Sequence, residues 1–172
     1  MDGFDSTAED VSKWKSQGKI VIGYISVGTR EDWNLDAVSW PSSAIGKIVD
    51  GWPGERWLIP GQWQTVKNVM SARFAMLKSK GFDGYEGDNI SLLDQGGVDS
   101  YLNDNIAYAQ WLATTAHSYG LLAIFKNGPD LVPNVLSYYD GCFAEEAFKY
   151  DEIDSYTPFY QSGKPVWIFE YP

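Results

Sequence analysis

Residues 81–89, Gly-Phe-Asp-Gly-Tyr-Glu-Gly-Asp-Asn, decide the expected fold. They follow a helical pattern over residues 64–80, in which apolar side chains are spaced to form one buried face. Gly81 stands where a helix commonly ends, and a strand over residues 82–87 comes directly after it. A helix, a stop and a strand that runs into acidic residues form one unit of an alternating α/β fold.

The same alternation recurs along the chain. Helices are predicted over residues 7–16, 64–80 and 101–119, with a short one before Asp140. Strands are predicted over residues 19–27, 56–59, 82–87, 121–125, 141–144 and 166–169. We expect all six strands to be parallel. No repeat or linker divides the 172 residues, so residues 1–172 are expected to form a single domain.

The expected architecture is an incomplete (β/α) TIM-type barrel. A closed eight-stranded barrel typically takes about 250 residues, and this chain has 172. Its first residues, Asp2-Gly3-Phe4-Asp5, resemble the exit of a strand and lead straight into a helix. We therefore expect the barrel to be truncated at the N-terminus, lacking its first strand, with an exposed sheet edge beside the first strand present.

Composition restricts the possible partners. With 13 basic and 23 acidic residues, the net charge of −10 repels nucleic acid and would attract a cationic ligand. No apolar run approaches the roughly 20 residues that cross a bilayer, and the N-terminus has no signal-peptide profile. Cys142 and His117 are the only residues of their types, so a His- or Cys-rich metal site is not expected. His117 falls within a predicted helix and is expected to be structural.

Polar side chains gather where the predicted strands end. In a parallel barrel these ends lie on one face, which is where the active sites of such folds are found. Crowded carboxylates raise one another's pKa, so that one can act as a general acid while another stays charged. Glycoside hydrolysis divides the work in this way, and Asp88 and Glu145 are the leading pair. Some of these groups could instead cap helices or pair with arginines; Glu31 is expected to be structural, and Asp88 with Asn89 could form an Asx turn.

Four segments carry a resemblance to a known family. Residues 24–33, 81–89, 125–127 and 169–171 resemble, in order and over nearly the whole chain, glycoside hydrolase family 114, the endo-α-1,4-polygalactosaminidases. The resemblance implies a (β/α)₈-barrel enzyme, usually secreted and therefore extracellular, with no metal or other cofactor. It also implies cleavage of α-1,4-linked galactosamine polymers, cationic amino-sugar polysaccharides, with retention of configuration.

The resemblance also implies roles for individual residues. The catalytic Asp of the family falls on Asp88, and the catalytic Glu on Glu145, although the Glu-Gln-Cys motif of the family reads Glu145-Glu146-Ala147 here. We expect Glu145 to be the acid with a raised pKa and Asp88 to be the nucleophile, with the exchange of these roles left open. Candidate substrate-binding residues are Asp2, Asp5, Tyr24, Ser26, Trp33, Glu86, Asn89, Lys126, Asn127, Glu170 and Tyr171.

Two other functions compete with this interpretation. Lys126 ends a predicted strand, from which a lysine can form a Schiff base with a carbonyl substrate, so a lyase is possible. If the truncation or the altered Glu145-Glu146-Ala147 segment has removed activity, a non-catalytic barrel that binds glycans is favoured instead.

Overall fold

The computed structural model describes residues 1–92 and 101–172 of the chain. Its centre is a parallel sheet of five strands in the order β1-β5-β6-β7-β8. The strands are β1 (Ile22–Ser26), β5 (Gly84–Asp88), β6 (Leu122–Lys126), β7 (Gly141–Glu145) and β8 (Val166–Phe169). The prediction of an incomplete TIM-type α/β barrel is therefore confirmed, and five of the six predicted strands lie in this sheet.

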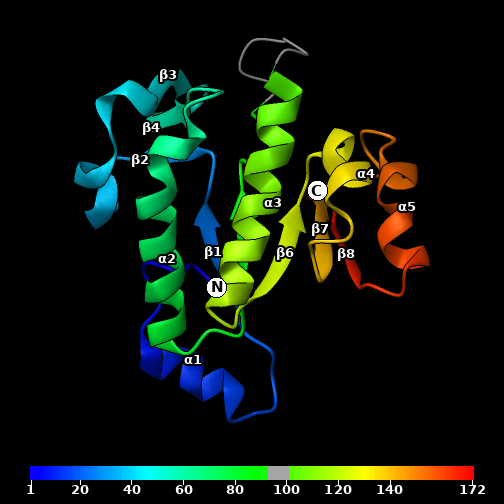
Figure 1. Cartoon of the computed structure of the whole chain (residues 1–172). Coiled ribbons are helices and arrows are strands. Elements are labelled where there is room, and N and C mark those ends of the chain that lie inside the picture. Colours follow the sequence, from blue (N-terminus) through cyan, green and yellow to red (C-terminus); the bar gives the residue numbers. More distant parts are fainter. Residues whose placement is uncertain (93–100) are drawn as a thin grey trace.

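The sixth predicted strand, over residues 56–59, does not join the parallel sheet. It forms part of β4 (Trp52–Leu58), the middle strand of a separate antiparallel sheet with β2 (Thr29–Glu31) and β3 (Ile45–Val49). The expectation that all strands are parallel is thus wrong. In Figure 1 this second sheet lies above β1, beyond the end towards which its arrow points.

Helices cover the outer side of the parallel sheet. They are α2 (Lys67–Lys80), α3 (Leu102–Ser118), α4 (Val132–Val135) and α5 (Ile153–Gln161), and α1 (Ala8–Lys15) packs against α2. Figure 1 shows α2 and α3 side by side in front of the sheet, with α4 and α5 beside β7 and β8. As predicted, α2 ends at Gly81, whose φ of +91° glycine adopts without strain. No helix among residues 1–92 and 101–172 has the length and apolar character that a bilayer crossing demands.

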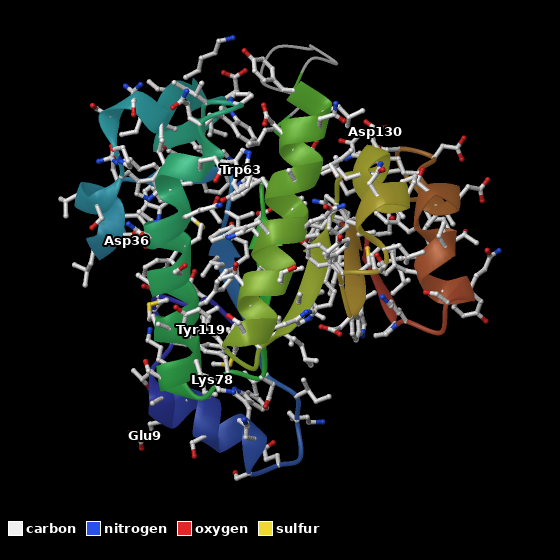
Figure 2. The ribbon with its side chains drawn as sticks, viewed as in Figure 1. Glu9, Asp36, Trp63, Lys78, Tyr119 and Asp130 are labelled. Carbon is white, nitrogen blue, oxygen red and sulfur yellow. The ribbon has the colours of Figure 1, made fainter. Side chains whose placement is uncertain are left out.

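The two faces of the parallel sheet differ in chemistry because strand side chains alternate. Ile25, Tyr85 and Phe125 are fully buried on the outer face, where the ring of Tyr85 lies 4.8 Å from that of Phe74 on α2. Trp63, labelled in Figure 2, extends this core between α2 and α3. The opposite face carries Glu86 and Asp88, as the alternation predicts.

The first residues of the chain lie along β1. Asp2 forms a parallel bridge with Tyr24, and the amide of Tyr24 donates to the carbonyl of Met1 at 2.8 Å. These contacts fit the prediction that the start of the chain resembles the exit of a strand. The outer edge of β1 is therefore covered in part by residues 1–3, whereas we expected it to be exposed.

Candidate active site

Lys126, the last residue of β6, stands among three carboxylates on the inner face of the sheet. Its Nζ lies 3.1 Å from Glu86 Oε1, 3.4 Å from Asp88 Oδ2 and 3.3 Å from Glu145 Oε2. The three carboxylates come from β5 and β7, the two strands that flank β6. The predicted gathering of acidic groups at the carboxyl ends of the strands is therefore present, with a cation at its centre.

This arrangement determines the charge of Lys126. Burial alone would lower the pKa of its ammonium group, but Asp88, Glu86 and Glu145 outweigh burial and raise that pKa above its usual value. Lys126 is therefore a fixed positive charge at neutral pH. Burial raises the pKa of Glu86, and the nearby ammonium group opposes this effect without cancelling it.

Asp88 is held by donors on both of its oxygens. The hydroxyl of Tyr24 donates to Oδ2 at 3.0 Å, and the backbone amide of Asn89 donates to Oδ1 at 2.8 Å. Tyr24 and Asp88 belong to adjacent strands, since β1 pairs with β5. The ring of Tyr24 also faces Lys126, whose Nζ lies 5.2 Å from its centroid. The carboxylate thus has a defined orientation.

Glu145 is held just as firmly. The hydroxyl of Tyr171 donates to Oε1 at 2.6 Å, and Asn127 Nδ2 donates to Oε2 at 3.1 Å. Burial would raise the pKa of Glu145, but these two donors and Lys126 lower it overall. The expectation of a raised pKa for Glu145 is therefore wrong. The hydrogen bonds from Tyr171 and Asn127 and the charge of Lys126 affect the pKa of Glu145 more than the neighbouring carboxylates do.

Three of the strands end in the same unusual backbone conformation. Asn89, Asn127 and Glu146 directly follow β5, β6 and β7, with φ of +58°, +54° and +52°. Left-handed backbone is uncommon for residues other than glycine, and it concentrates at functional sites. This turn directs Glu146 away from the cluster to Lys149, 2.5 Å away, which identifies Glu145 as the member of the Glu145-Glu146 pair that faces Lys126.

A cavity of about 350 Å³ opens beside the cluster. Asp88, Asn89, Lys126, Asn127 and Glu145 line it, as the sequence suggested. Further lining residues that we did not predict include Trp57, Asp130, Tyr150 and Glu152. Asp130 directly follows Gly128-Pro129, after β6. A Gly-Pro pair commonly marks a loop, so the sequence could have predicted a loop at this strand end and Asp130 as a candidate site residue. Figure 2 labels Asp130 at the same end of the molecule as the antiparallel sheet.

Several predicted site residues lie elsewhere. The Asp2 carboxylate accepts hydrogen bonds from the backbone amides of Phe4 and Asp5, at 2.8 Å each, and so stabilises its own turn. Asp5 is exposed. Trp33 is exposed and packs over Gly54. Glu170 accepts the amide of Phe148 at 2.9 Å.

Two other residues have supporting positions. Ser26 is buried behind the cluster, where its hydroxyl contacts Thr29 and Asn89. His117 pairs with Asp140 at 2.8 Å, and the same Asp140 accepts the amide of Ala123 at the start of β6. This pairing fits the structural role expected for His117.

Comparison with known proteins agrees with the site. A model of glycoside-hydrolase family GH114 matches residues 1–172. The chain is similar to the crystal structure of Ega3 from Aspergillus fumigatus in complex with galactosamine, with 33% identity and a TM-score of 0.91, covering 99% of this chain and 68% of that chain. It also shares the fold of the glycoside hydrolase domain of PelA from Pseudomonas aeruginosa, at 16% identity and a TM-score of 0.74, covering 99% and 75%.

A more distant likeness in fold is that to the maltogenic α-amylase AmyB of Thermotoga neapolitana, at 11% identity and a TM-score of 0.55, covering 91% and 37%. No curated protein gives a significant match. The match to the family over the whole length, together with the likeness to Ega3, shows that the chain is a glycoside hydrolase of family GH114.

Proposed function

We propose that this glycoside hydrolase cleaves α-1,4-linked galactosamine polymers by a two-carboxylate retaining mechanism, with Asp88 and Glu145 as the catalytic pair. The observation that carries the proposal is the position of the two carboxylates. They stand at the ends of β5 and β7, line one cavity, and contact the same ammonium nitrogen.

Their spacing is compatible with retention. Because Asp88 Oδ2 and Glu145 Oε2 both lie within 3.4 Å of Lys126 Nζ, these two oxygens are separated by no more than twice that distance. Retaining glycosidases place their carboxyl groups about 5 to 5.5 Å apart, with no water between nucleophile and sugar. The upper bound admits that spacing.

We assign the nucleophile to Asp88 and the acid/base to Glu145. Both oxygens of Asp88 are oriented, by Tyr24 and by the backbone of Asn89, as an in-line attack on the anomeric carbon requires. The Glu145 carboxylate is the more exposed of the two, at 29% against 22%, so it can reach the glycosidic oxygen and later a water molecule. Its lowered pKa in the free protein places its protonated form at acidic pH.

The charge of the protein supports a cationic substrate. The net charge is −10, and Asp130 and Glu152 add acidic groups to the cavity wall. Trp57 and Tyr150 offer flat apolar faces beside them, which suit sugar rings. The presence of galactosamine in the Ega3 structure supports the same substrate class, and the family resemblance supports a secreted protein.

The two competing functions find less support in the cluster. A Schiff-base lysine must be neutral to attack a carbonyl group, whereas the carboxylates around Lys126 raise its pKa. A barrel that only binds glycans has no need of two oriented carboxylates on one cation. It is nevertheless an outcome that the test must recognise.

The test compares the release of reducing ends from a partly deacetylated α-1,4-galactosamine polymer. Asp88→Asn and Glu145→Gln should each lower turnover by roughly three orders of magnitude or more, because each removes a group that acts only in the transition state. Glu9→Gln is the control, an exposed carboxylate on α1 at the opposite end of the molecule (Figure 2), and it should leave turnover unchanged.

Parent-like turnover in either site variant would remove that residue from the mechanism. Binding of the polymer by the parent protein without any cleavage would identify a binding barrel.

A further inference from the structure

A second pair of buried carboxylates lies behind the candidate site. Glu31 on β2 and Glu55 on β4 stand directly opposite each other in the antiparallel sheet, and each is 6% exposed. Like charges directly opposite each other destabilise a sheet, so their presence calls for a reason. The contacts of the two residues differ, and that difference points to a role for only one of them.

Glu55 reaches the site through a chain of hydrogen bonds. Its Oε1 accepts from the hydroxyl of Thr29 and from Nδ2 of Asn89, the latter at 3.3 Å. The same Nδ2 donates to the hydroxyl of Ser26 at 3.1 Å, and the Ser26 and Thr29 hydroxyls bond to each other. The side chain of Asn89 is therefore held by groups from β1 and from the antiparallel sheet.

Asn89 in turn orients Asp88. Its backbone amide donates to Asp88 Oδ1 at 2.8 Å while its own backbone is left-handed. Its carbonyl lies so close to Gly28 that a Cβ at that glycine would come within 1.7 Å of it. Such a backbone conformation persists only where its surroundings hold it, and the side-chain bond to Glu55 supplies part of that restraint.

The antiparallel sheet is itself anchored at this point. The amide of Leu58 at the end of β4 donates to the carbonyl of Gly28 at 2.7 Å, and the amide of Val27 donates to the carbonyl of Asp88 at 2.8 Å. The sheet that carries Glu55 is therefore hydrogen-bonded next to the turn at Asn89, whose side chain Glu55 contacts.

We infer that Glu55 is a positioning residue for Asp88, acting through the side chain of Asn89. The expected effect of Glu55 on turnover rests on the proposed catalytic role of Asp88. The claim that Glu55 positions Asp88 does not depend on that role. Glu31 provides the matched control, because it is equally buried and directly opposite. Its bond is with Asn34 Nδ2, at 2.7 Å, and not with Asn89.

The structural test is an NMR titration of the Asn89 backbone amide. Because this amide donates to the Asp88 carboxylate, its resonance in the parent protein should depend on pH. Glu55→Met removes the acceptor for Asn89 and should reduce this pH-dependent shift at least about twofold. Glu55→Gln keeps an acceptor oxygen and should preserve the shift, as should Glu31→Met.

Glu55→Asp is a second variant that tests the inference if Glu55→Met does not fold. It keeps a carboxyl group on β4 but withdraws its oxygens by one methylene group from Asn89 Nδ2, so it should behave like Glu55→Met. A parent-like Asn89 titration in Glu55→Met or Glu55→Asp would overturn the inference.

A kinetic arm measures the consequence for catalysis. On the galactosamine polymer, Glu55→Met should lower kcat roughly 10- to 100-fold, as expected for a misplaced nucleophile, with KM within about twofold of the parent value. Glu31→Met should leave kcat unchanged, and Glu55→Gln should restore most of it. Equal losses of kcat in Glu31→Met and Glu55→Met would indicate general destabilisation and overturn the inference. If the parent protein cleaves nothing, the proposed function fails, and the NMR titration still decides the role of Glu55.

Discussion

Lys126 is the residue on which the charge balance of the site depends. Its side chain is 8% exposed and contacts Glu86, Asp88 and Glu145. Removing one partner of a buried ion pair lowers the free energy of unfolding by more than the intact pair adds to it. The reason is that the remaining charges are left buried without an opposite charge.

The first prediction follows from this dependence. Lys126→Met should lower the free energy of unfolding at pH 7 by about 3 to 5 kcal/mol. Lys126 lowers the pKa of Glu86 and of Glu145, so its removal should raise both pKa values, and protonation then favours the folded state of the variant. The deficit should therefore shrink as pH falls from 7 towards 5. Urea denaturation at both pH values measures it, with Lys149→Met, an exposed lysine, as the control. An equal deficit at both pH values would contradict the prediction.

Tyr171 provides a second prediction, which also separates the two catalytic roles. Its hydroxyl helps to lower the pKa of Glu145, so Tyr171→Phe should raise that pKa. If Glu145 is the acid, it must be protonated for the first step, and the basic limb of the kcat/KM profile should move to higher pH. If Glu145 were the nucleophile, the acidic limb would move to higher pH instead. The profile of the parent protein is the reference for both outcomes.

At the scale of elements, the antiparallel sheet of β2, β3 and β4 contributes buried carboxylates that the barrel strands do not. Burial, opposed by Arg73 and reinforced by Glu55, raises the pKa of Glu31 to about 7. A carboxyl group whose folded pKa lies above its ordinary value of 4.5 favours folding when it is protonated. The stabilising contribution is present below about pH 4.5 and is lost as pH rises through about 7.

Glu31→Gln should therefore stabilise the protein at higher pH. The variant stays neutral and keeps an acceptor for Asn34, so it should not lose stability between pH 4.5 and 7 as the parent does. Above pH 7 we expect a gain of roughly 1 to 3 kcal/mol over the parent. Thermal unfolding across this pH range measures the difference. If the difference in stability between variant and parent were the same at every pH, folding would not change the pKa of Glu31, and the prediction would be wrong.

The two sheets differ in how well the sequence predicted them. The parallel strands were found because each is a short apolar run set between helical patterns, and alternation placed Glu86 and Asp88 on one face. The antiparallel sheet was missed because β2 has three residues and β4 contains Pro53 and Gly54, which break a strand pattern. Asp50-Gly51 between β3 and β4 was an available hairpin signal. Glu55 was missed with its strand.

The contacts of Glu145 show a different limit. Sequence placed the residue at the end of a strand, and crowding by other acids suggested a raised pKa. Its pKa is lowered because Tyr171, 26 positions further along the chain, folds back to donate to it. Which donors reach a carboxylate depends on tertiary placement, which periodicity does not encode.

At the scale of the molecule, β8 is an edge strand of the parallel sheet among the described residues 1–92 and 101–172. This strand ends the order of the parallel sheet, and its residues Trp167, Ile168 and Phe169 are 42%, 38% and 45% exposed. Trp167 and Phe169 each form a T-shaped ring contact with Phe143 on β7, and part of this aromatic surface is exposed to solvent. A sheet edge combined with exposed apolar side chains promotes association.

The 172-residue chain should therefore self-associate in a concentration-dependent manner. Ile168→Lys should weaken the association, because a charge on an edge strand opposes pairing. Leu35→Lys, which alters an exposed apolar residue outside β8, should not. Sedimentation velocity over a range of concentrations distinguishes these cases. A parent protein that stays monomeric throughout would contradict the prediction.

The measurement that tests the two-carboxylate mechanism most directly is the configuration of azide products. A galactosamine oligomer ending in an α-fluoride, which leaves with little need of an acid, is incubated with azide and with Asp88→Ala or Glu145→Ala. Without its nucleophile, Asp88→Ala should let azide attack from the β face and form the β-glycosyl azide. In Glu145→Ala, Asp88 still displaces fluoride, and azide then attacks the glycosyl-enzyme from the α face to form the α-glycosyl azide. NMR should show these opposite configurations. The same configuration from both variants, or no azide product from either, would contradict the mechanism.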